Sequence, residues 1–65
     1  MTVDLQELPR NVTEAADMLR PWLGKPNMLH KVFVQVDELA TFPAQAARAK
    51  HLFRLAYNLC TGQGE

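Results

Sequence analysis

The side chains best suited to nucleophilic or metal chemistry are one cysteine, Cys60, and two histidines, His30 and His51. A catalytic thiolate requires a base close to it, and structural zinc sites combine cysteine and histidine at short, regular spacings. These three residues match no familiar ligand spacing, and Cys60 falls on the apolar side of an expected helix, where we expect a small buried thiol. The chain contains no serine, which excludes a serine nucleophile. We therefore expect no catalytic residue, no metal ligand and no cofactor.

Acidic residues form three close pairs that could suggest general acid–base chemistry. The pairs are Asp4/Glu7, Glu14/Asp17 and Asp37/Glu38. The first two have a spacing of three residues, which places both carboxylates on one helix face, but they fall near expected helix starts, where the helix dipole favours acids anyway. The chain has no glycine-rich phosphate loop, no Cys-x-x-Cys and no EF-hand pattern. We expect neither an enzyme nor a small-molecule substrate.

The chain has 65 residues, which is enough for one helical domain over 1–65. Its composition is 48% hydrophobic and 22% charged, and seven basic residues balance seven acidic ones. This balance indicates a folded chain and excludes a strongly basic nucleic-acid binder. A domain of this size buries only about 60% of the surface that its unfolded chain exposes. Because one cysteine cannot form an internal disulfide, we expect added support from self-association or from a partner.

The apolar segments of the sequence are short. None approaches the roughly 18 residues that a membrane-spanning helix requires, and the longest, over 52–60, is interrupted by Arg54 and Asn58. The first residues are acidic and lack the apolar region of a signal peptide. Together with the lone cysteine, these features predict a cytoplasmic protein that does not contact a membrane.

Hydrophobic periodicity predicts helices over 11–23, 27–40 and 43–60. Asn11 is a favourable N-cap with Glu14 three residues later, and Pro21 should end the regular part of the first helix near Arg20. Pro43 suits the first turn of the third helix. The short linkers favour nearly antiparallel neighbours, so the predicted fold is all-α, a compact three-helix bundle.

Two segments are open to a second interpretation. Residues 31–36 are rich in β-branched and aromatic side chains and alternate as a strand would, although the apolar face continues over four helical turns. Residues 1–10 are compatible with a short extra helical turn or with an edge strand. At the other end, 61–65 is expected to be a flexible polar tail.

The third helix has an apolar arc wider than a helix needs for one neighbour. The arc comprises Leu52, Phe53, Leu55, Ala56, Tyr57, Leu59 and Cys60. Such an arc indicates packing on two sides, either within the bundle or against a second chain. We therefore predict a small non-catalytic protein–protein interaction module, a regulator, adaptor or inhibitor of a larger protein, or a homodimer. Trp and Tyr are common at interface hot spots, and the predicted partner-binding residues are Trp22, Arg48, Leu55 and Tyr57.

Basic charge on the third helix supports an alternative function. Between Glu38 and Glu65 there are no acids, while three basic residues and one histidine are present, namely Arg48, Lys50, His51 and Arg54. Such a patch predicts contact with phosphate, as in a small DNA-binding transcriptional regulator that reads bases with Gln45 and Arg48. The other explanation is a solvated face that balances Glu14 and Asp17 across a helix–helix seam.

Overall fold

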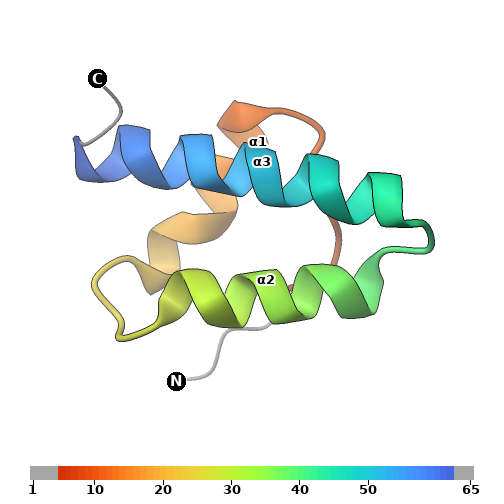
Figure 1. Cartoon of the computed structure of the whole chain (residues 1–65). Coiled ribbons are helices and arrows are strands. Elements are labelled where there is room, and N and C mark those ends of the chain that lie inside the picture. The colour runs from red at the N-terminus through yellow and green to blue at the C-terminus, as the bar shows by residue number, and fades with distance from the viewer. Residues whose placement is uncertain (1–4, 63–65) are drawn as a thin grey trace.

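The computed structural model describes residues 5–62 and contains, over that range, helices and loops but no strand. The elements are α1 (Val12–Leu19), the short 3-10 helix η1 (Arg20–Trp22), α2 (Met28–Leu39) and α3 (Pro43–Thr61). α2 and α3 lie side by side and run antiparallel, while α1 crosses behind α3 (Figure 1). The predicted all-α three-helix bundle is confirmed. The expected antiparallel packing holds for α2 and α3 only, because α1 runs across α3 rather than along it.

α1 begins and ends where the sequence predicts. Asn11 Oδ1 accepts a 2.8 Å hydrogen bond from the backbone N–H of Glu14, and Glu14 Oε1 accepts one of 2.9 Å from the N–H of Arg10. The first bond satisfies one of the N–H groups that a helix start leaves unpaired, and the second fixes the backbone just before the cap. Pro21 lies in η1, so the α-helix ends at Leu19. The turn that follows uses Gly24 at a φ of +87°, a conformation that side chains disfavour.

α2 settles the choice between helix and strand for 31–36. Val32 and Val36, one helical turn apart, are fully buried, whereas Val34 is 44% exposed on the outer side. A strand would place all three valines on one face. Burial of one helical face therefore outweighs the β preference of these residues.

α3 starts with a side-chain cap supplied from inside the helix. Gln45 Oε1 accepts hydrogen bonds from the backbone N–H groups of Thr41 at 2.8 Å and Phe42 at 3.3 Å. The helix ends at Thr61, whose hydroxyl donates to the carbonyl oxygen of Tyr57 at 2.9 Å, and Gly62 at φ +76° follows. Thr61, placed in the polar tail from the sequence, is therefore helical, and 63–65 lie outside the described residues.

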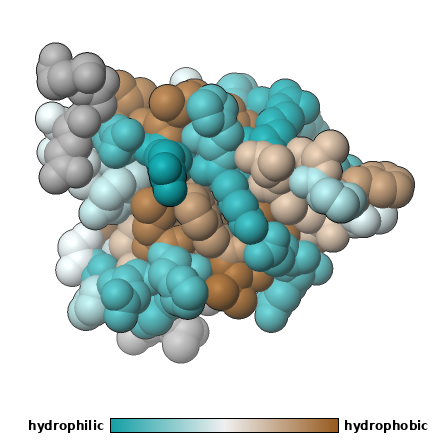
Figure 2. Space-filling model, in the orientation of Figure 1, coloured by the Kyte–Doolittle hydropathy of each residue, from teal (hydrophilic) through white to brown (hydrophobic). Residues whose placement is uncertain are grey.

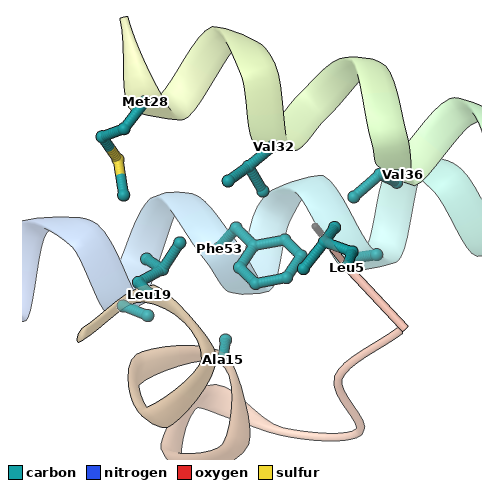
Figure 3. Packing of buried hydrophobic residues seen from close by; sticks show 9 residues of the cluster. Leu5, Ala15, Leu19, Met28, Val32, Val36 and Phe53 are labelled. Atoms are coloured by element: carbon teal, nitrogen blue, oxygen red, sulfur yellow. The ribbon is translucent and has the colours of Figure 1, made fainter. Parts of the chain in front are cut away.

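The helices and the N-terminal segment share one apolar core (Figure 3). Phe53 of α3 lies at its centre, between Leu19 of α1 and Val32 of α2 (Figure 3). The other buried members are Leu5, Ala15, Met28, Val36, Ala49 and Ala56. Alanines on both α1 and α3 belong to this cluster, and their small side chains permit the two helices to approach closely where they cross. Within 5–62 no charged or polar residue is buried.

Residues 5–10, before α1, form a strap across the end of the core and are neither the helical turn nor the strand considered from the sequence. Leu5 is buried, and its backbone N–H donates a 2.6 Å hydrogen bond to Oε1 of Gln35 on α2. Pro9 is also buried. The segment therefore contributes core contacts that helical periodicity does not reveal. The first four residues of the predicted turn or strand lie outside the described range.

Candidate interaction surface

The buried side of α3 is narrower than its apolar arc. At about 100° per residue, Ala49, Phe53 and Ala56 fall on one side of the helix, and these three are its buried residues. α3 contacts both α1 and α2 through this side and its margins. The remaining apolar residues of the arc are therefore partly or largely exposed.

Three leucines on a neighbouring side of α3 form what we call the leucine strip: Leu52, Leu55 and Leu59. They lie within about 60° of arc around the helix. Leu52 is half-buried, Leu55 is 39% exposed and Leu59 is 65% exposed. Of the two kinds of packing considered for the apolar arc, Leu59 makes no contact within the bundle that buries it, because neither α1 nor α2 covers its side of the helix. Hydrophobic atoms are visible along the upper edge of the molecule, over α3 (Figure 2).

Cys60 is exposed, which overturns the prediction of a buried thiol. Its position around the helix does match the buried side. However, the last turn of α3 extends past the ends of α1 and α2, so no other helix covers it (Figure 1). Burial here is decided by where the neighbouring helices end, which helical periodicity cannot indicate.

The predicted partner-binding residues do not form one continuous surface. Arg48 and Leu55 lie about 20° apart around α3, and Arg48 extends the leucine strip toward the N-terminus of the helix. Tyr57 lies about 160° from Leu55 and is half-buried. Trp22 is half-buried beside a depression that is also lined by Leu5, Gln6, Glu7 and Met18. Around α3, the fold therefore places Arg48 and Leu55 on one side and Tyr57 on another.

The predicted basic patch is also divided. Lys50, His51 and Arg54 line one depression together with Phe33 and Ala47. Arg48 lies about 160° from Lys50 and about 120° from Arg54 around the helix. Its guanidinium instead donates a 3.3 Å hydrogen bond, through Nη2, to the carbonyl oxygen of Arg10.

One basic residue of α3, Lys50, is paired with an acid of α2 rather than of α1. Lys50 Nζ lies 2.8 Å from Asp37 Oδ1, which joins the two antiparallel helices. Asp17, expected to face the basic residues across a seam, pairs instead with Arg20 at 2.7 Å. Gln45, considered as a base reader, has its side-chain oxygen engaged in capping α3.

The corner between α2 and α3 carries an exposed aromatic residue that is not among the predicted partner-binding residues. Phe42 is 61% exposed, and Leu39 in the last turn of α2 is also exposed. Figure 2 shows hydrophobic side chains projecting at this corner. The sequence does indicate this exposure. Phe42 stands directly before Pro43, between two predicted helices, and so belongs to the apolar face of neither.

The described residues contain neither a candidate metal centre nor a candidate membrane span. No group of three or more His, Cys, Asp or Glu side chains within 5–62 is placed to hold a metal ion. The same range has no helix with the length and apolar character needed to cross a bilayer. No protein-family model, curated protein or solved structure matches the chain. Its function is therefore inferred from the exposed surface of α3.

Proposed function

We propose that this chain is a small, non-catalytic protein–protein interaction module that binds its partner along the leucine strip of α3. The observation that carries the proposal is the exposure of Leu55 and Leu59 on a side of the helix that the core does not use. Burying apolar surface is favourable by about 25 cal/mol per Å², so a partner that covers these leucines gains affinity without disturbing the fold.

Arg48 gives this surface a polar end. The guanidinium is exposed and lies within about 40° of all three leucines around the helix. A complementary partner offers an apolar stripe and, opposite Arg48, a carboxylate or free carbonyl groups. A regulator, adaptor or inhibitor of a larger protein would act through such a contact. We place this activity in the cytoplasm, where the exposed Cys60 thiol stays reduced.

Site-specific photo-crosslinking tests the proposal directly. A benzophenone side chain is introduced at position 59 of the leucine strip, and separately at position 34 of α2 as the control. Val34 is exposed and apolar like Leu59 but lies on the outer side of α2. We expect a defined adduct in cells from position 59 and none from position 34. Equal adducts from both positions, or none from position 59, would refute the leucine strip as a binding surface.

A DNA-binding regulator is the second candidate, because Lys50, His51 and Arg54 do share one depression. The weakness of this candidate is the small number of cations that its depression can offer to phosphates. Lys50 is paired with Asp37, and Arg48 is on another side of the helix. Few cations are therefore free to contact phosphates from that depression, and salt-dependent affinity grows with the number of phosphates neutralised.

A further inference from the structure

We infer that the partner of the leucine strip is a second copy of this chain, with the two α3 helices packed antiparallel. The inference rests on the proposed function and names its partner. It has two independent grounds, the spacing of the residues along α3 and the uncompensated charge at the ends of that helix.

The residues of the surface are spaced symmetrically along α3. Arg48, Leu52, Leu55 and Leu59 follow one another at intervals of four, three and four residues. Reversing the direction of the helix leaves this pattern unchanged. A two-fold axis between positions 53 and 54 therefore places Leu52 against Leu55 of the second copy and Leu59 against the aliphatic stem of its Arg48. Such a self-complementary patch is what a two-fold interface requires.

The charges of α3 favour the same arrangement. The helix has no acidic residue in its first turn and no basic residue in its last turn, so neither end of its dipole is compensated from within. Antiparallel pairing sets each positive helix start beside the negative end of the other copy. It also brings the Arg48 guanidinium toward the carbonyl groups at the end of the second α3. Its hydrogen bond to Arg10 uses one of several N–H donors and leaves others for this contact.

The interface is small. Three leucines and an arginine from each copy cover less than the roughly 1,200 Å² that a stable interface buries in total. We therefore expect a weak dimer, with a dissociation constant on the order of micromolar or above. Dimer formation should accordingly depend on protein concentration.

Sedimentation equilibrium over a range of concentrations tests the dimer. We expect the apparent mass to rise from 7.4 kDa toward twice that value. Leu55→Asp should abolish the rise, because it places a charge in the centre of the interface. Val34→Asp is the matched control, and it should dimerise like the unmodified chain with the same helical circular dichroism signal. A chain that stays at the monomer mass at every concentration would overturn the inference, as would loss of the dimer in both variants.

A double-mutant cycle tests the direction of pairing. Arg48→Glu and Leu59→Lys should each weaken the dimer. Combined in one chain, they should restore association beyond the product of the single effects, since antiparallel pairing sets the two new charges of opposite sign against each other. A parallel dimer brings position 48 to position 48, so strictly multiplicative effects would overturn the antiparallel arrangement.

The crosslinked product from position 59 separates the two levels of the proposal. An adduct between two copies supports both. An adduct with a different protein, from a chain that sediments as a monomer, overturns self-pairing and leaves the interaction module standing.

Discussion

The backbone N–H of Leu5 donates a 2.6 Å hydrogen bond to Oε1 of Gln35, which joins the N-terminal strap to the middle of α2. The contact links residues 30 positions apart in the sequence and is partly buried. It therefore holds Leu5 in the core, where the leucine side chain covers Phe53 and Val36 (Figure 3).

Replacing Gln35 tests how much this link contributes. We expect Gln35→Ala to lower the free energy of unfolding by about 1–2 kcal/mol, because a partly buried N–H loses its acceptor. Glu38→Ala, on the exposed side of the same helix, is the control and should change stability little. Urea denaturation of the three proteins measures the difference. Equal stability of all three would show that the strap is not held by Gln35.

The core depends on Phe53 far more than on its neighbour Leu55. Truncation of a fully buried phenylalanine removes about 3–5 kcal/mol, which is as much as a single core of this size supplies. We expect Phe53→Ala to be largely unfolded at 25 °C and Leu55→Ala, at a partly exposed position, to lose less than about 1 kcal/mol. Thermal unfolding followed by far-ultraviolet circular dichroism distinguishes them. Similar losses in both variants would contradict the assignment of Leu55 to the surface.

The exposure of Cys60 predicts rapid thiol chemistry in the folded state. The reaction with Ellman's reagent should proceed at nearly the same rate in native buffer and in guanidinium chloride, because no unfolding step precedes it. A buried thiol would react slowly in the native protein and quickly in denaturant, and that outcome would refute the exposed last turn of α3.

The separation of the basic residues around α3 leads to a prediction about DNA binding. If the chain is an interaction module, fluorescence anisotropy should detect no binding to duplex DNA at low salt. If it binds DNA through the depression at Lys50, then Arg54→Ala should reduce the slope of log affinity against log salt by about 0.9. Arg48→Ala should leave that slope unchanged, because Arg48 lies on another side of α3. Equal effects of both substitutions would mean that the two sides act as one patch.

Local signals in the sequence predicted the helices well. These signals act within a few residues of themselves: Asn11 caps a helix, Pro21 ends one and Pro43 fits the first turn of another. The strand interpretation of 31–36 failed for a tertiary reason, since burial of Val32 and Val36 on one helical face overrides local preference.

The surface of α3 was less predictable because it depends on distant elements. Cys60 was expected to be buried, and Leu59 to pack either within the bundle or against a second chain. The exposure of both residues follows from where α1 and α2 lie and end. The basic residues of α3 were considered to balance acids of the first helix. The packing of α2 against α3 instead places Asp37 beside Lys50. Arg48 and Tyr57 are separated by the core side of α3, which a sequence pattern without packing partners cannot locate.

The core that α1 and α3 share contains three alanines, Ala15, Ala49 and Ala56. An alanine side chain has no rotamers to lose on burial, whereas a buried leucine or methionine gives up conformational entropy. The crossing of these helices therefore forms with little entropic penalty from side chains. The core of so short a chain therefore combines a few large side chains, such as Phe53, with alanines whose burial costs no side-chain entropy.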